Sequence, residues 1–169
     1  MRRRNGLTVV ECLVAMTILS IVVLVTAHTL AAGQQHVHYG DRIATAARLG
    51  RDVLEEVTSR AYRDETLPAN FGPETGEARA TFDDADDYHN YTEAAGALRD
   101  FAGNLYAADD QQFSRSVTVT AATQTVLLRD TVSGVDVPRD FAGLRVVVTV
   151  RAANGVQWQF ARFIPEPAL

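Results

Sequence analysis

The hydrophobic pattern divides the first third of the chain into an unbroken apolar run and an amphipathic segment. Residues 7–32 are mostly apolar with a few small hydroxyl residues, and Glu11 is the one acidic residue among them. Read as a helix, this run is about 39 Å long at roughly 1.5 Å per residue, which is enough to cross a bilayer. The pattern therefore predicts a transmembrane helix over residues 7–32.

The helical pattern continues beyond the apolar run but becomes two-sided. Between residues 33 and 62, apolar and small residues recur every three or four positions, and charged residues lie between them. The recurring positions include Ile43, Ala46, Gly50, Val53 and Val57. We expect an amphipathic helix that ends near Tyr62 and packs its stripe of small and aliphatic residues against a sheet.

Residues 63–113 have no regular hydrophobic period. Prolines and glycines interrupt this stretch, and acidic residues outnumber basic ones. We interpret it as a long acidic connecting region, the variable part of the domain. A connection of this length inside a compact domain is unusual and is often functional.

The remaining chain, residues 114–169, has the two-residue period of strands. Residues 116–121 and 156–164 alternate, 144–152 is rich in valine, and 125–128 is short enough for an edge piece. Asn154-Gly155 is a strong hairpin turn signal. The valine face of residues 144–152 is expected to pack on the helix, which gives an α+β fold: a long N-terminal helix against a C-terminal antiparallel sheet.

Charges around the apolar run predict its orientation. Arg2, Arg3 and Arg4 precede it, and the first residues after it carry only Asp41 and Arg42. The positive-inside rule then keeps the N-terminus in the cytoplasm and places the C-terminal domain outside. A cleaved secretory signal peptide or an ordinary signal anchor shares this arrangement, but neither explains why an acid lies within the run.

The segment Gly6-Leu7-Thr8-Val9-Val10-Glu11, followed by Cys12-Leu13-Val14-Ala15-Met16-Thr17-Ile18-Leu19, resembles the N-terminal signal of type IV pilins and type II secretion pseudopilins. The resemblance implies a six-residue leader, residues 1–6, that a prepilin peptidase removes between Gly6 and Leu7. It also implies methylation of the new Leu7 amine. In this family a threonine and a glutamate follow at the positions of Thr8 and Glu11, where they serve assembly.

A carboxylate and an amine are each costly in lipid but stabilise one another as a charge-assisted pair. From the residues alone, the Leu7 amine and Glu11 could pair within one chain or between neighbouring chains. The resemblance implies that Glu11 of one subunit pairs with the Leu7 amine of a neighbour. It thus implies prepilin peptidase, other pilin or pseudopilin subunits, an inner-membrane assembly platform and membrane lipid as partners. Leucine in place of the commoner phenylalanine, and no glycine or proline between Leu7 and Ala32, favour a minor pilin or pseudopilin over a major pilin.

Composition narrows the functional classes further. Without the leader the chain has 13 basic and 21 acidic side chains, so a nucleic-acid partner is not expected. No phosphate-binding glycine loop and no nucleophile beside a histidine motif occurs in the sequence, which predicts that the chain is not an enzyme. The single cysteine, Cys12, falls inside the apolar run and is expected to be a small buried hydrophobe.

Four aspartates gather in the connecting region, at Asp83, Asp84, Asp86 and Asp87. Such a density of carboxylates can bind calcium, although the spacing does not fit an EF-hand. The other interpretation is a solvated acidic loop that Phe82, Tyr88 and Tyr91 anchor to the domain. No other cofactor is indicated by the sequence.

The sequence as a whole predicts a structural subunit, a minor pilin or pseudopilin of a type IV pilus or type II secretion filament. It would cross the bacterial inner membrane once, with an extracytoplasmic domain. The alternative is a non-polymerising, single-pass anchored domain whose acidic loop binds a ligand or calcium.

Overall fold

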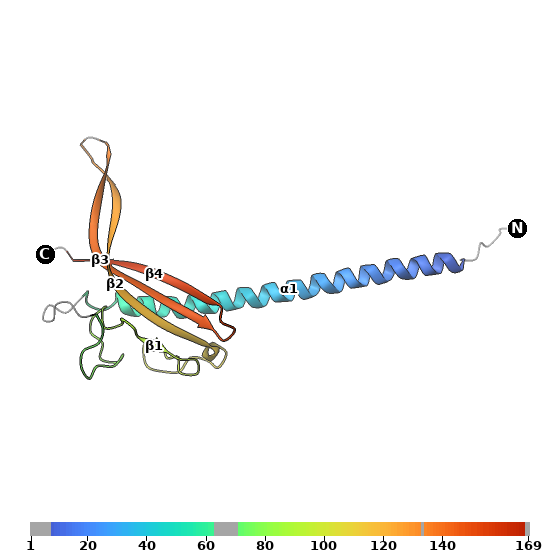
Figure 1. Ribbon diagram of the computed structural model, residues 1–169, viewed down its shortest axis with the longest axis horizontal. Coiled ribbons are helices and arrows are strands. Elements are labelled where there is room, and N and C mark those ends of the chain that lie inside the picture. Colours follow the sequence, from blue (N-terminus) through green and yellow to red (C-terminus); the bar gives the residue numbers. More distant parts are fainter. Residues whose placement is uncertain (1–7, 63–70, 133, 168–169) are drawn as a thin grey trace. The chain divides into compact units, whose positions relative to one another are not determined.

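A computed structural model describes residues 8–62, 71–132 and 134–167. The chain divides into two compact units, residues 1–42 and 43–169. Its elements in order are the helix α1 (Val9–Thr58), the strand β1 (Thr92–Glu93), the 3₁₀ helix η1 (Asp110–Gln112) and the strands β2 (Phe113–Arg129), β3 (Asp136–Ala152) and β4 (Gln157–Pro165), as Figure 1 shows. This is the α+β arrangement that the sequence predicts.

Helix α1 is one unbroken element, as expected from a segment without proline. It ends at Thr58, a few residues before the predicted end near Tyr62. The amide of Arg60 donates to the carbonyl of Val57 in a tighter turn, and the backbone of Ala61 then bonds with the acidic region. The amide of Ala85 donates to the Ala61 carbonyl at 2.9 Å, so pairing with another segment ends the helix.

The four strands form one antiparallel sheet in the order β1-β2-β3-β4. The predicted hairpin at Asn154-Gly155 joins β3 to β4, and Gly155 has the positive φ of 84° that this turn requires. The prediction of a separate edge piece at residues 125–128 was wrong. These residues continue β2, whose antiparallel register with β3 runs without a bulge from Phe113 to Arg129.

The second strand of this pair is also longer than predicted. Strand β3 begins at Asp136, eight residues before the valine-rich segment. Strand β4 pairs with β3 only as far as Gly143. Beyond that point, among the residues described, β2 and β3 pair only with each other, in a register that ends at Arg129 and Asp136. Figure 1 shows this two-stranded ribbon continuing past the rest of the sheet.

The hydrophobic core of residues 43–169 lies between the helix stripe and the valine face of the sheet, as predicted. Its helical members, Ala46, Leu49, Val53 and Val57, are fully buried. Val146, Val148 and Val150 of β3 belong to the same cluster. The helix approaches β4 so closely at Gly50 that an added Cβ would lie 2.3 Å from the Phe160 ring.

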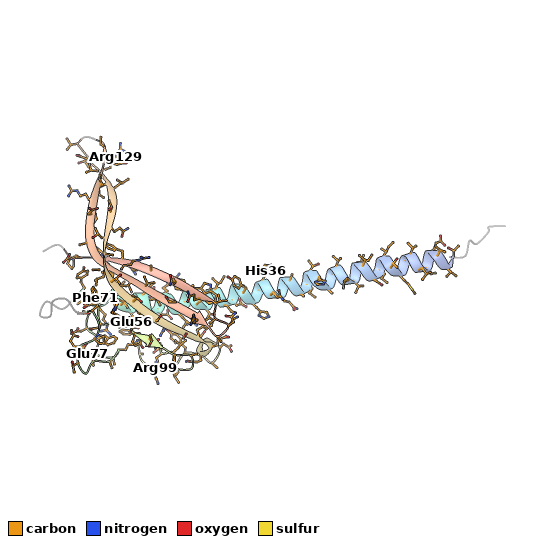
Figure 2. All side chains as sticks on the ribbon, in the orientation of Figure 1. His36, Glu56, Phe71, Glu77, Arg99 and Arg129 are labelled. Atoms are coloured by element: carbon orange, nitrogen blue, oxygen red, sulfur yellow. The ribbon has the colours of Figure 1, made fainter. Side chains whose placement is uncertain are left out.

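A buried network of four charged side chains joins the helix, the connecting region and the sheet. Glu56 lies on α1, Arg79 in the connecting region, Glu93 on β1 and Arg115 on β2 (Glu56 is labelled in Figure 2). Arg79 donates from Nε to Glu56 Oε1 at 2.8 Å and from Nη1 to Glu93 Oε1 at 2.7 Å. Arg115 donates from Nε to Glu93 Oε2, its cross-strand neighbour.

Neutral groups satisfy much of the remaining hydrogen-bonding capacity of this network. Arg115 donates from Nη1 to the Leu49 carbonyl at 3.1 Å and from Nη2 to the Arg99 carbonyl. Tyr88 donates its hydroxyl to Glu56 Oε1 at 2.8 Å, and burial together with this bond raises the pKa of Tyr88. Two carboxylates and two guanidiniums therefore balance in charge within the core.

We expect Arg115→Met to destabilise the domain strongly. The substitution leaves Glu93 buried with one cation instead of two and removes the donor to Leu49. Losing one member of a buried pair costs about 3–5 kcal/mol. Chemical denaturation of the detergent-solubilised full chain would measure this loss in the free energy of unfolding.

The matched control is Arg129→Met on the same strand. Arg129 is 75% exposed and lies 4.0 Å from Asp136, so its removal should cost at most about 1 kcal/mol. Equal denaturation midpoints for the two variants would contradict a stabilising role of the network.

Candidate functional site

The N-terminus of α1 is organised by Thr8 and Glu11, two residues of the predicted assembly site. Glu11 Oε2 accepts the backbone N–H of Thr8 at 2.7 Å and its hydroxyl at 3.1 Å. In return, Thr8 Oγ1 accepts the backbone N–H of Glu11 at 3.3 Å. This reciprocal pattern is a capping box, which satisfies amides that the helix itself leaves unbonded. Gly6 and Leu7, the predicted cleavage and methylation positions, lie outside the described residues.

Both Thr8 bonds reach Oε2, so among the residues that the structure describes the other carboxylate oxygen of Glu11 is left for another donor. The negative charge also lies at the positive end of the helix dipole, which favours it. Glu11 is thus held in place by its own helix and can still accept a hydrogen bond from an amine. This arrangement is compatible with the predicted pairing to Leu7, which stays a prediction.

The hydroxyl residues farther along the apolar run bond to their own helix. Thr17 donates to the Val14 carbonyl at 2.8 Å, and Ser20 donates to the Met16 carbonyl at 2.8 Å. Thr26 and Thr29 do the same with preceding carbonyls. Bonds of this kind let hydroxyl groups lie in lipid without an external partner.

The apolar side chains of the run are exposed. Val9, Leu13, Ile18 and Leu24 are between 57% and 77% accessible, and α1 is long and apolar enough to cross a membrane. Cys12, predicted to be buried, is exposed as well. A surface of this kind needs lipid or other apolar helices around it.

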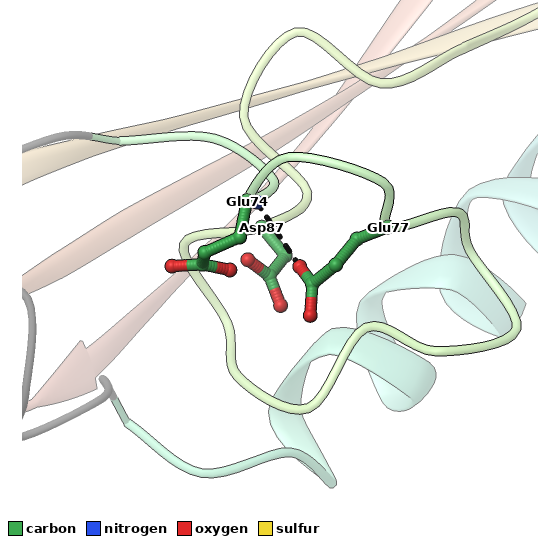
Figure 3. Close-up of side chains that lie close together, drawn as sticks. All are labelled: Glu74, Glu77 and Asp87. Carbon is green, nitrogen blue, oxygen red and sulfur yellow. Dashed lines mark hydrogen bonds between the residues drawn. The ribbon is translucent and has the colours of Figure 1, made fainter.

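The acidic region brings carboxylates together in two overlapping groups. Asp83, Asp84 and Asp87 form one group, in which oxygens from the three side chains lie within 4.8 Å of one another. Glu74, Glu77 and Asp87 form the other, which Figure 3 shows in close-up. Asp86, the fourth aspartate predicted from the sequence, belongs to neither group. Glu74 and Glu77 were not predicted as candidate cation ligands. The available signal in the sequence was that these two glutamates lie three residues apart, shortly before the aspartates.

The expectation of a solvated loop was wrong for most of the aspartates. Asp84, Asp86 and Asp87 are only 1–6% exposed. The carboxylates of Asp84 and Asp87 bond to the loop's own backbone. Asp84 Oδ1 accepts the amides of residues 86 and 87, and Asp87 Oδ2 accepts those of residues 83 and 84. The aromatic anchors are as expected, with Phe82 and Tyr88 buried and in edge-to-face contact at 4.9 Å.

The carboxylates of this region differ in their proton affinity. Burial raises the pKa of Asp87, and the neighbouring Asp84 and Glu74 charges add to that effect. A hydrogen bond with the Glu77 carboxylate raises the pKa of Glu74. A bound cation would stabilise the ionised form of these carboxylates. However, hydrogen bonds within the loop already account for much of the arrangement of the carboxylates. Calcium binding by Asp83, Asp84, Asp86 and Asp87 stays a prediction.

These pKa directions give opposite pH dependences for two aspartates. The raised pKa of Asp87 means that its contribution to stability is full below its unfolded pKa and is lost as pH rises through the folded value. Asp100 has a pKa lowered by the Asn104 amide, so its contribution is present above its unfolded pKa and lost as pH falls through the folded one.

We therefore expect Asp87→Asn to raise the melting temperature relative to the unchanged protein as pH increases from about 4 to 7. Asp100→Asn, the control of opposite sign, should lower it most near neutral pH. Thermal unfolding of the full chain in detergent at several pH values measures both differences. A constant difference between Asp87→Asn and the unchanged protein at all pH values would contradict the raised pKa.

Comparison with known protein families finds a match on the N-terminal segment. Residues 1–27 match the model of the prokaryotic N-terminal methylation motif. No curated protein and no solved structure matches the chain. The matched residues include the predicted cleavage position and the Thr8–Glu11 capping box. Over its first 27 residues, the chain carries the prepilin motif of type IV pilin-like proteins.

Proposed function

We propose that this chain is a minor pilin or pseudopilin, a structural subunit of a type IV pilus or type II secretion filament. The observation that carries the proposal is the methylation-motif match over residues 1–27, which indicates a prepilin-processed, pilin-like protein. The unbroken course of α1 through the apolar run supports a minor subunit over a major one. The role is structural rather than enzymatic.

In the proposed pathway, the apolar helix first anchors the chain in the inner membrane with its arginines in the cytoplasm. Prepilin peptidase then cuts between Gly6 and Leu7 and methylates the Leu7 amine. The assembly platform next draws the helix among other subunits. Exposed side chains of residues 9–25 exchange lipid contacts for helix contacts at this step.

Glu11 gives the proposed assembly its register. Its carboxylate is fixed by Thr8 in its own chain and offers an oxygen to the amine of a neighbour. Both groups lie in an environment of low dielectric constant, where a charge-assisted bond is strong and an unpaired charge is costly. Pairing favours one axial position of the incoming subunit over the others.

The processing step predicts a defined N-terminus. In native membranes the N-terminal peptide should begin at N-methylated Leu7, and without the peptidase it should retain the leader. Gly6→Ala should leave most cleavage intact or make it slower. Gly6→Leu should block cleavage, because a bulky side chain replaces a hydrogen atom next to the cut. Mass spectrometry of the peptide measures these outcomes.

An intact leader in the presence of the peptidase would identify an ordinary signal anchor. A start near Gly33 would instead identify a secreted domain. Either result would contradict the proposed function.

The assembly step predicts that Glu11→Val is cleaved normally but enters filaments poorly. A hydrogen bond to a charged group contributes about 1.5–3 kcal/mol, so incorporation should fall roughly ten- to hundredfold. Thr17→Val is the matched control, since that hydroxyl bonds only to its own helix. Quantitative immunoblots of sheared or purified filaments measure incorporation.

Normal incorporation of Glu11→Val into filaments would contradict the charge-pair mechanism. Absence of the unchanged chain from every filament fraction would favour the non-polymerising anchored domain instead.

A further inference from the structure

The connecting region and the turn after α1 line a partly open cavity of about 540 Å³. Its charged lining consists of three arginines, Arg60, Arg79 and Arg99, and one carboxylate, Asp100. Residues 43–169 as a whole contain twelve arginines and nineteen acidic residues. A wall on which basic side chains outnumber acidic ones is therefore an exception in this unit, and it favours an anionic ligand.

Two of the three arginines lack a carboxylate partner. Arg79 forms ion pairs with Glu56 and Glu93, so its charge is balanced within the buried network. Neither Arg60 nor Arg99 forms an ion pair with any residue that the structure describes. These two arginines contribute two positive charges and Asp100 contributes one negative charge. One positive charge is therefore left in excess on the wall of the cavity.

The surroundings of Arg60 leave its charge without a counter-ion. Its Nε is buried and donates no hydrogen bond to a described residue. The guanidinium carbon lies 5.4 Å from the centroid of the Phe101 ring, and the group also interacts with the Tyr88 hydroxyl. Both neighbours are neutral, whereas arginines withdrawn from water are usually paired with an acid. An anion in the cavity would supply the missing negative charge.

Arg99 is held at the cavity by its backbone (Arg99 is labelled in Figure 2). Its carbonyl accepts from Arg79 Nη1 at 3.0 Å, and its amide donates to Glu93 Oε1 at 3.2 Å. The exposed side chain donates from Nη1 to the Gly103 carbonyl at 2.7 Å, so among the described residues its other N–H groups stay available. A binding group that is fixed in advance lowers the entropy cost of binding.

Aromatic and small side chains complete the wall. Phe101 is 66% exposed although it is large and apolar. Tyr91 is half-buried, with the Arg79 guanidinium 5.6 Å from its ring centroid. The other four lining residues are three alanines and a glycine. This composition accommodates an apolar body, and the volume falls in the range of roughly 300–1,000 Å³ that is typical of small-molecule sites.

The charges near the cavity favour a ligand with a single negative charge. A second cavity shares Asp100 and Phe101 with the first. It is lined by acidic residues at Asp52, Glu55 and Glu56. These acids would repel a more highly charged anion. Because the planar guanidinium group matches the two oxygens of a carboxylate, a carboxylate on an apolar body fits better than a phosphate ester.

We propose that this cavity binds an organic acid. Arg60 and Arg99 balance the charge of a single carboxylate, and the apolar body of the ligand packs against Phe101 and Tyr91. Two sources share this chemistry: a free small acid, and the C-terminal carboxylate of a peptide that ends in an apolar residue. The site lies outside the matched residues 1–27 and is independent of the proposed function.

The test titrates the full chain, solubilised in a non-ionic detergent, with phenylacetate. Phenylacetamide has the same apolar body without the charge and is the matched control ligand. Isothermal titration calorimetry should give a Kd of about 1 mM or below for phenylacetate and one at least tenfold higher for the amide. No saturable binding of phenylacetate up to about 10 mM, or equal affinity of the two ligands, would overturn the proposal.

Two further probes define the ligand. An acetylated tripeptide that ends in phenylalanine presents the same carboxylate at a peptide terminus. Tighter binding of the tripeptide supports a peptide terminus as the source, and tighter binding of phenylacetate supports a free acid. Phenyl phosphate, which is mostly dianionic at neutral pH, should bind no more tightly than phenylacetate. A preference of tenfold or more for the phosphate ester would overturn the assignment to carboxylates.

Charge-removing variants test the position of the site. Arg60→Gln should weaken phenylacetate binding at least tenfold. Arg99→Gln should weaken it about fivefold, because solvent screens the charge of an exposed side chain. Arg129→Gln, which removes a 75% exposed arginine on β2, is the matched control and should leave binding unchanged. Unchanged affinity in Arg99→Gln, whose exposed side chain is not needed for folding, would refute the site even if Arg60→Gln fails to fold.

Discussion

The fold of residues 43–169 depends on keeping four charges inside an apolar core. The charges come from the helix, the connecting region and two strands, at Glu56, Arg79, Glu93 and Arg115. Each of them is neutralised in the core only when its partners are in place. A buried charge without a partner costs several kcal/mol, whereas the complete set is neutral and largely hydrogen-bonded. This requirement makes docking of the connecting region part of folding the helix and sheet. The connecting region, which has few strands of its own, is thereby held in one backbone conformation.

The helix and the central strands could be predicted because their signals are local. An apolar run without proline predicts an unbroken helix, and the alternation around Val146 and Val148 predicts a strand with one buried face. The start of β3 was missed because Asp136, Pro138 and Asp140 are typical of a loop. There, pairing with β2 overrides the local preference.

Features that join distant segments could not be predicted in the same way. Arg79 and Glu56 are separated by 23 positions, and Arg115 and Glu93 by 22, so no sequence spacing reveals their contact. Arg115 even occupies an inward position between buried valine and phenylalanine, where an apolar residue would be expected. The N-terminal site is the opposite case, since Thr8 and Glu11 are three residues apart and their spacing alone predicts a capping box.

The close approach of Gly50 to Phe160 has a mechanical consequence. The ring occupies the space that a side chain at position 50 would need, and the buried residues Ala46 and Val53 lie about one turn away on either side. Sliding residues 43–58 along the sheet by a turn would bring a larger side chain against the ring. The contact thus opposes sliding of the helix along the sheet. Tension applied along this part of the helix is therefore transmitted to β4.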